Sequence, residues 1–304
     1  MTDPAIATPP AHASDRDRRI ERSRRTLEFA IDALIRPGSW AAKIAYELGL
    51  QGRVHSRTHR FDLGRRSRDA VRPTLRVAFA ADFHAGATTD ERLLADACRL
   101  LAAFAPDLLL LGGDFVSVRA SYIDRLAPLL SAIHAPLGKL AVLGNHDLRA
   151  DRPTVLRGLR DAGVRVLDNE AVRLAAPFDD VTICGLSDIT RGNPRPDLAI
   201  DGVTEGARVV LMHSPQALRA IGDRAFDLAL CGHTHGGQIA LPWGEGGGTP
   251  IIMSGGDLNR RYARGVFTLD GHPPRSLLVT NGVGCSTAPL RLFAAPEVHL
   301  CLIT

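Results

Sequence analysis

Apolar runs and amphipathic stretches alternate along the first half of the chain. Short runs of valine, leucine, phenylalanine and alanine predict buried strands, whereas apolar residues spaced three or four apart between these runs predict helices. The strands are expected at residues 75–81, 107–111 and 139–143, and the helices at 90–104, 122–133 and 154–162. Because strands separated by helices pair in parallel through right-handed crossovers, this half predicts an α/β domain with a parallel sheet.

The second half has a different pattern, in which strand-like segments follow one another with few helices between them. These segments lie near residue 166 and at 171–174, 181–184, 209–212, 228–231, 239–241, 266–269, 277–280 and 298–303. A series of this kind predicts a mixed or antiparallel sheet that faces the first one.

The first 74 residues differ from the rest in composition. Residues 1–15 are rich in proline, alanine and small polar residues without periodicity, which predicts a disordered tail. Residues 16–74 are expected to form a basic amphipathic helical arm and connector, and residues 75–304 the main domain. Two short helices are expected in the arm, and a strand at 57–63. The helices are separated by Pro37 and Gly38, and their apolar positions are Leu27, Ile31 and Leu34, then Trp40, Ile44 and Leu48.

Three interpretations of residues 16–50 remain open. The helices pack on the domain or on another copy of it, or their basic, tryptophan-containing surface lies on an anionic membrane. The third interpretation is a twin-arginine export signal at 23–27, although the stretch that follows is too charged and has no small-residue cleavage site. A spanning helix is not expected, because charged residues interrupt every window near the roughly 20 apolar residues that a crossing requires. These residues are Asp32, Arg36, Lys43 and Glu47.

The charge distribution and the cysteine content indicate which partners and which cellular compartment to expect. Residues 1–74 contain 15 Lys and Arg against 9 Asp and Glu, so the net charge of +4 originates there. Aromatic residues make up only 5% of the chain and do not interleave with basic ones, which argues against a nucleic-acid partner. The five cysteines are widely spaced and mostly inside apolar runs, which indicates buried thiols in a reducing compartment. We therefore expect a cytoplasmic protein, with peripheral contact to the inner membrane through residues 16–50 as an open alternative.

Five polar clusters follow five of the apolar runs. Each comes just past the end of a predicted strand, where open α/β sheets carry their chemistry. Taken singly they are weak evidence, because a strand-terminal turn explains D-x-H or G-D and a satisfied core histidine explains a lone His. Their joint presence in one order indicates a single site. The clusters are D-F-H at 82–84, G-G-D at 112–114, G-N-H-D at 144–147, His213, and G-H-T-H at 232–235.

The residue types in these clusters fit a metal site that cleaves phosphoesters. The reaction needs a strong nucleophile at neutral pH and neutralised charge on the phosphoryl oxygens, which two divalent cations about 3.5 to 4 Å apart supply. The clusters offer carboxylates and imidazoles but no cysteine, which favours Mn, Fe, Zn, Co or Ni over a soft thiolate site. Asp114 is expected to bridge both ions, because the glycines before it leave room for close approach.

In their order, the clusters resemble the calcineurin-like metallophosphoesterase superfamily over about residues 75–304. The resemblance implies a four-layer α/β/β/α sandwich of two mixed sheets and two divalent ions, Mn, Fe or Zn. It assigns the first ion to Asp82, His84, Asp114 and His235. It assigns the second ion to Asp114, Asn145, His213 and His233. It makes His146 the residue that contacts the phosphate and protonates the leaving oxygen, with Asp147 orienting the imidazole.

More narrowly, G-G-D-F at 112–115, H-S-P at 213–215 and G-H-T-H-G-G-Q at 232–238 are similar to a bacterial branch of membrane-associated phosphodiesterases. No large insertion separates Asp147 from His213, so no cap domain is expected over the site. The leading hypothesis is a hydrolase in which a metal-bridging hydroxide attacks the phosphorus of a monoester or diester, on a small-molecule or lipid-linked substrate. The alternatives are a UDP-2,3-diacylglucosamine pyrophosphatase that acts on a nucleotide-lipid, and a non-catalytic scaffold, which predicts decayed ligands.

Several positions near the clusters are further candidates. Arg119, Arg149 and Arg191 are placed to grip a substrate phosphate, although solvated surface arginine is the simpler interpretation. Segments 243–248 and 281–291 are candidates for shaping a substrate groove, or are ordinary loops of the second sheet. No feature of the sequence indicates the oligomeric state.

Overall fold

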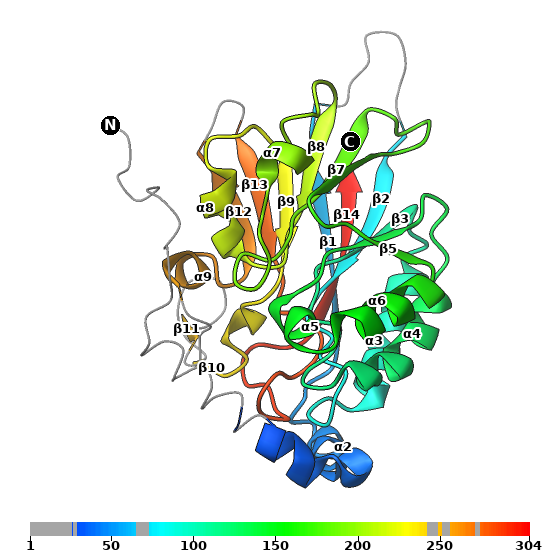
Figure 1. Ribbon diagram of the computed structural model, residues 1–304, viewed down its shortest axis with the longest axis vertical. Helices are drawn as coiled ribbons and strands as arrows, with labels where there is room; N and C mark the ends of the chain where they lie inside the picture. The colour runs from blue at the N-terminus through cyan, green and yellow to red at the C-terminus, as the bar shows by residue number, and fades with distance from the viewer. Residues whose placement is uncertain (1–25, 27–28, 65–72, 242–248, 251–255, 271–273) are drawn as a thin grey trace.

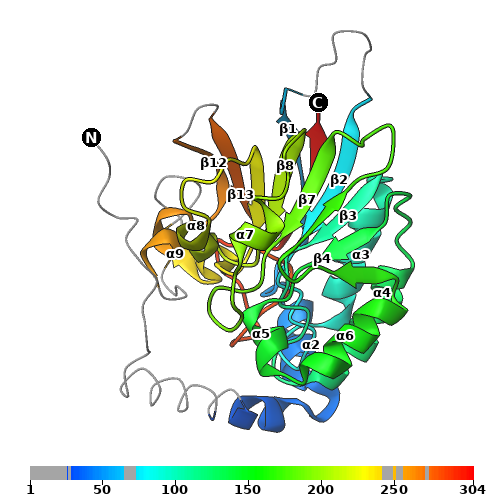
Figure 2. The same cartoon turned by 45° about the horizontal axis from the view of Figure 1, so that its top comes forward.

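Two six-stranded sheets face each other, and helices cover their outer faces (Figures 1 and 2). The computed structural model describes residue 26 and residues 29–64, 73–241, 249–250, 256–270 and 274–304. The architecture is the α/β/β/α sandwich that the sequence predicts. The tail at 1–15, the arginines of the export-signal motif and the segment 243–248 lie outside the described residues.

The first sheet contains the strands of the first half and one strand from each end of the described chain. Its order is β1-β14-β2-β3-β4-β5. β2 to β5 run parallel, β14 is antiparallel to β2, and β1 is parallel to β14. The bounds are β1 (His55–Phe61), β14 (Glu297–Ile303), β2 (Leu75–Ala80), β3 (Leu108–Leu111), β4 (Lys139–Ala141) and β5 (Val164–Val166).

The second sheet is mixed, and its four inner strands are parallel. Its order is β12-β13-β9-β8-β7-β6, with antiparallel strands only at the two edges. The bounds are β12 (Gly265–Leu269), β13 (Arg275–Val279), β9 (Leu228–Cys231), β8 (Ala207–Leu211), β7 (Val181–Gly185) and β6 (Glu170–Arg173). A separate two-stranded ribbon joins β10 (Ala240–Leu241) to β11 (Thr249–Pro250).

Three of the segments predicted for the second sheet lie elsewhere. The segment near residue 166 forms β5, the edge strand of the first sheet, where it pairs with β4. The segment at 239–241 forms β10 of the separate ribbon. The segment at 298–303 was expected in the second sheet, but β14 lies inside the first sheet between β1 and β2. Its side chains are buried on both faces, so its pattern suits any central strand. The choice between the sheets depends on pairing with β2, which is distant in sequence.

Helices form the two outer layers (Figure 2). The long helices cover the first sheet, and α3 illustrates why they form. Asp90 caps it by accepting the N–H of Arg92 at 2.9 Å, and Leu93, Ala97 and Leu101 repeat on its buried face. The helices on this side are α3 (Glu91–Ala103), α4 (Ile123–Ser131) and α6 (Arg152–Asp161), and the other helices are α2 (Trp40–Glu47), α5 (Asn145–Arg149), α7 (Pro196–Ala199), α8 (Leu218–Ile221) and α9 (Asp257–Arg261).

Successive side chains of a strand point to opposite faces of its sheet, and the apolar residues are thereby divided among three cores. In β2, Ala78 and Ala80 face α3 and α4, whereas Val77 and Phe79 face the second sheet. In the core between the sheets, strands of both sheets bury leucine and valine against one another. A third core lies between the second sheet and the short helices α7 and α8. The strand ends that carry the polar clusters are thereby held by packing on both faces.

The described part of the arm packs on the domain. The carboxylate of Asp32 accepts hydrogen bonds from Nε of Arg119 at 2.7 Å and from the hydroxyl of Tyr122 at 3.0 Å, and Ile35 is buried against the first core. A 3-10 turn at Pro37–Ser39 leads into α2. Within the described residues, no helix combines the length and the apolar character that a membrane crossing requires.

Candidate metal centre

The polar clusters meet at one edge of the sandwich, where parallel strands of both sheets end. β2, β3 and β4 lead into three clusters, and β8 and β9 lead into the other two. Nδ1 of His213 lies 2.8 Å from the carbonyl oxygen of Gly112, and the N–H of His233 donates to the Asp82 carboxylate at 2.9 Å. These contacts join the two sheets. The assembly contains all seven candidate ligands, which are Asp82, His84, Asp114, Asn145, His213, His233 and His235.

Asp82, His84 and His235 form the first group of ligand atoms, which lie within 4.8 Å of one another. The Nε2 atoms of the two histidines are 3.0 Å apart. Oδ1 of Asp82 lies 3.7 Å from Nε2 of His235. Two imidazoles and a carboxylate that converge in this way match the donors that divalent transition metals prefer.

Asp114, His213 and His233 form the second group, and the side chain of Asn145 lies beside it. Nε2 of His213 is 3.1 Å from Nδ1 of His233 and 3.1 Å from Oδ1 of Asn145. The same nitrogen is 3.3 Å from Oδ2 of Asp114. This group therefore offers two imidazoles, a carboxylate and an amide oxygen.

Oδ2 of Asp114 connects the two groups. It lies 3.5 Å from Nε2 of His84 and 3.3 Å from Nε2 of His213. Oδ1 of the same carboxylate accepts the backbone N–H of His146 at 2.7 Å, which fixes the orientation of the side chain. One carboxylate is thus within reach of cations held by either group.

The backbone is strained at most of these residues. Five of the ligands have φ between 42° and 71°, which is the left-handed region that residues other than glycine rarely adopt. They are Asp82, His84, Asp114, His233 and His235. Each such residue costs on the order of 1 kcal/mol or more, and strain of this kind concentrates at functional sites. The packed strands before each turn hold the ligands in these conformations.

Two glycines allow the carboxylates to approach the neighbouring turns. A Cβ on Gly144 would lie 2.2 Å from Oδ1 of Asp114, and a Cβ on Gly232 would lie 2.2 Å from Oδ2 of Asp82. No real side chain tolerates such distances. Glycine is therefore required in the G-N-H-D and G-H-T-H turns because the ligands occupy the space.

The electrostatics of the site favour a bound cation. Burial raises the pKa of Asp82 to about 7, and the charge of Asp114 adds to the effect. Burial alone would also raise the pKa of Asp114, but the neighbouring His213 and His146 hold it well below its usual range. Burial, with the nearby His84, lowers the pKa of His235 well below its usual value and keeps the imidazole neutral. Burial would lower the pKa of His213, but the charge of Asp114 holds it well above its usual value. A divalent ion would replace the proton on His213 and neutralise the buried carboxylates, so the residues fit such an ion.

The ring of His146 lies against the first group. Its centroid is 4.7 Å from that of His84, edge to face. Nδ1 lies 2.8 Å from the carbonyl oxygen of Ser117 and 2.8 Å from Nη2 of Arg149. A carbonyl only accepts and a guanidinium only donates, so Nδ1 serves one of them at a time. When Nδ1 donates to Ser117, Nε2 is the ring nitrogen left for a ligand.

Asp147 holds the turn that carries Asn145. Its Oδ1 accepts the N–H groups of Phe115 and Val116 at 2.8 and 3.2 Å, and its Oδ2 accepts the N–H of Gly144 at 2.9 Å. Burial, reinforced by the charge of Asp114, raises the pKa of Asp147 to about 8. The structure therefore gives this side chain a part in positioning backbone, and its expected action on the imidazole of His146 stays a prediction.

Two buried residues next to the site were not singled out from the sequence. Asp188 follows β7, beside the end of β8 that leads to His213, and its Oδ2 has no hydrogen-bond partner among the described residues. Its position after the apolar run 181–184 was the signal available. Arg291 is buried, and its Nη2 lies 3.2 Å from Nδ1 of His235 while its other nitrogens bind backbone carbonyls. An isolated arginine in a loop carries no such signal.

The three arginines proposed as phosphate ligands have different surroundings. Arg119 is paired with Asp32 of the arm. Arg149 contacts the ring of His146, so it is adjacent to the metal centre. The backbone N–H of Arg191 donates to Oδ1 of Asp188 at 2.7 Å, which closes the loop after β7. Arg149 thus contacts a candidate site residue.

The chain also matches known proteins. The family model described as calcineurin-like phosphoesterase matches residues 75–237. Phosphodiesterase YaeI of Escherichia coli (strain K12) is 34% identical over 237 residues, which cover 74% of this chain and 80% of that protein. UDP-2,3-diacylglucosamine pyrophosphatase LpxG of Chlamydia trachomatis serovar D is 26% identical over 276 residues, which cover 74% of this chain and 82% of that protein. The region matched by the family model includes every candidate ligand.

Proposed function

Because the chain belongs to the calcineurin-like phosphoesterase family and is a phosphoester hydrolase, we propose that it uses two divalent transition-metal ions to cleave a phosphodiester. The sequence leaves monoesters and diesters open. The similarity to a protein named as a phosphodiesterase favours the diester.

The observation that carries the two-ion proposal is the position of Asp114 between the two groups of ligand atoms. Asp82, His84 and His235 complete one ion site. Asn145, His213 and His233 complete the other, and Asp114 is shared by both. When bound, the ions supply charge neutralisation at the phosphoryl oxygens and lower the pKa of water at the site. Mn, Fe and Zn suit these oxygen and imidazole donors.

His146 is the proposed proton donor to the leaving oxygen. The carbonyl of Ser117 accepts from Nδ1, so that Nε2 of the protonated ring points its N–H toward a substrate next to His84. Asp147 keeps Gly144, and with it the start of α5, in place through a hydrogen bond at 2.9 Å. Arg149 supplies positive charge on the same side.

A second candidate substrate is a nucleotide-lipid, as in UDP-2,3-diacylglucosamine pyrophosphatases. It is favoured by the 26% identity to LpxG, a protein of that name. A non-catalytic scaffold is the third candidate, and it predicts loss of ligands. The intact set of seven argues against it.

A substrate panel tests this proposal. The full chain is reconstituted with Mn, and hydrolysis of bis(p-nitrophenyl) phosphate, p-nitrophenyl phosphate and UDP-2,3-diacylglucosamine is compared, with His146→Ala as the matched variant. We expect the diester to be cleaved fastest, and metal analysis to give about two equivalents per chain. Turnover of the UDP-lipid alone would replace the diester assignment, and less than one equivalent of metal after Mn or Fe supplementation would favour the scaffold.

A further inference from the structure

Helix α2 presents its apolar side to the outside of the protein. Its buried residues are the small Ala42 and Ala45, whereas Trp40, Ile44 and Leu48 are exposed. These three residues are spaced four apart, so they form one stripe along the helix. Ile44 is 53% and Leu48 67% exposed, which is unusual for large apolar residues on a packed helix.

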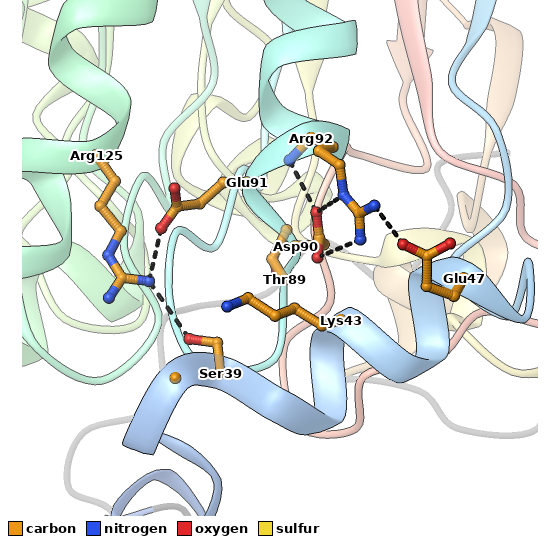
Figure 3. Close-up of a pocket in the computed structure, with 9 residues that line it drawn as sticks. Ser39, Lys43, Glu47, Thr89, Asp90, Glu91, Arg92 and Arg125 are labelled. Atoms are coloured by element: carbon orange, nitrogen blue, oxygen red, sulfur yellow. Dashed lines mark hydrogen bonds and ion pairs between the residues drawn. The ribbon is translucent and has the colours of Figure 1, made fainter.

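Polar contacts hold the helix in this orientation (Figure 3). Arg92 of α3 binds Glu47 and its own neighbour Asp90, and its guanidinium also lies 4.2 Å from the centroid of the Tyr46 ring. At the start of α2, Nη1 of Arg125 lies 3.4 Å from Oγ of Ser39. The polar edge of the helix thus faces the domain, and the stripe cannot turn inward without breaking these contacts.

The stripe continues onto the loop before β14. The backbone N–H of Arg291 donates to the carbonyl of Leu50 at 2.7 Å, so this loop lies beside the residues that follow α2. Leu50 is exposed, and so are the two residues after Arg291, with Phe293 at 58%. We call the six side chains together the apolar band. They are Trp40, Ile44, Leu48, Leu50, Leu292 and Phe293.

One end of the apolar band is connected to the metal centre through Arg291. Leu292 and Phe293 directly follow Arg291, whose Nη2 lies 3.2 Å from Nδ1 of His235. Figure 1 shows α2 and this loop at the same end of the sheets as α5, which carries Asn145 and His146. A surface that covered the band would therefore lie at the same end of the sheets as the metal centre.

Positive charge surrounds the start of α2. Arg36, Arg119 and Arg125 line a cavity of about 380 Å³ there. Asp32 pairs with Arg119 and Glu91 with Arg125, whereas no ion pair of Arg36 is seen within the described residues. The segment 1–74 adds a surplus of basic residues, 15 against 9 acidic. Apolar side chains that include an exposed tryptophan, next to arginines, match the interface of an anionic bilayer.

We propose that the apolar band docks on an anionic lipid bilayer and thereby brings the metal centre to phosphoesters at the membrane surface. The docking stands on the exposed residues alone, and its link to catalysis rests on the proposed function. A second copy of the chain is a less suitable occupant, because each copy would bring the same arginines to the interface.

Vesicle co-sedimentation of the full chain tests docking without any turnover. The vesicles contain phosphatidylcholine with 30% phosphatidylglycerol, or phosphatidylcholine alone. Ile44→Ser and Phe293→Ser each remove one exposed apolar side chain that docking would bury, and each should weaken binding about tenfold or more. The matched controls are Leu198→Ser on α7 and Val266→Ser on β12, residues that are 58% and 48% exposed but lie outside the band. Both controls should bind like the parent.

Several outcomes would overturn docking. These are absence of binding to either vesicle, equal weakening by the control variants, or a dimer in light scattering that Ile44→Ser converts to monomer. Binding that persists in both band variants would equally contradict it. Hydrolysis of a soluble aryl phosphodiester is measured on the same samples, and we expect the band variants to keep the parent rate. Absence of diester hydrolysis in the Mn-loaded parent chain, with intact vesicle binding of that chain, would instead refute the proposed function and leave docking in place.

Discussion

Replacing Gly232 with alanine tests whether the turn geometry sets the metal centre. In the structure, a Cβ at this position would lie 2.2 Å from Oδ2 of Asp82 and 2.7 Å from Cβ of Ala81. Since real Cβ contacts do not fall below 3.0 Å, the carboxylate must move by about 0.8 Å. Movement of the carboxylate alone is not sufficient, because the new Cβ would still lie 2.7 Å from Cβ of Ala81, so the turn must shift as well.

The expected loss of metal affinity and activity follows from how little displacement of a ligand a metal site tolerates. Ligand positions are held to within about 0.2 Å in good sites, so a shift four times larger disrupts the first group. We expect metal affinity to fall by about 10 to 100-fold and the rate by about 100-fold. Overpacking also costs about 1 to 3 kcal/mol of folding free energy, which leaves a folded protein with a melting temperature lower by several degrees.

The assay measures Mn content after dialysis, Mn affinity by calorimetry, and diester hydrolysis. The matched control is Gly202→Ala, because a Cβ there meets nothing within 4 Å and φ is not in the left-handed region. The control should keep both metal and activity. If Gly232→Ala binds Mn with the parent affinity and turns over at the parent rate, the assignment of Asp82 as a ligand next to this turn is wrong.

Three further predictions concern Asp114, His146 and Glu297. Asp114→Asn should lower the occupancy of both ions, because the lost charge is shared, and two full equivalents by metal analysis would contradict bridging. His146→Ala should keep its metal and lose about two to four orders of magnitude in rate, whereas an unchanged rate would exclude it as the proton donor. Burial would raise the pKa of Glu297, but hydrogen bonding to His299 lowers it from 4.5 to about 2. The ionised carboxylate therefore stabilises the folded protein above pH 4.5, and this stabilisation is lost as the pH falls through 2. Glu297→Gln should remove this acid dependence, up to about 3 kcal/mol, from melting curves recorded between pH 6 and 2, and equally steep curves for both proteins would contradict it.

Local patterns were sufficient to locate the parts of the metal centre. The runs at 77–81, 108–111 and 209–212, before Asp82, Asp114 and His213, are apolar at every position, which indicates strands buried on both faces. The ends of such strands are the places where polar residues gather, so the order of the clusters could be read without coordinates. The four-layer sandwich followed from the same alternation and from the resemblance.

Contacts between distant segments could not be read in this way. β14 has the pattern of a central strand in any sheet, and only its pairing with β2 decides the sheet. Asp188 has only the signal of an acidic residue after an apolar run, and Arg291 has none, although both are buried. The hydrogen bonds of Asp147 join it to Phe115 and Val116, which precede it by 32 and 31 residues in the sequence. They depend on the approach of two separate segments, which no local pattern predicts.

Five ligands have left-handed backbone conformations, and these conformations persist only because packed strands hold the turns in place. A chain free to relax would leave those conformations, since each is unfavourable by on the order of 1 kcal/mol or more. Here the strands before the turns are fixed by the core between the sheets, and glycines at 144 and 232 remove the clashes that would otherwise push the carboxylates apart. The same packing holds Asp82 and Asp114 close together against their mutual repulsion, and burial together with this repulsion raises the pKa of Asp82 to about 7. A divalent cation relieves that repulsion, so metal binding increases the free energy of unfolding, and tighter packing of the two sheets increases the affinity for metal.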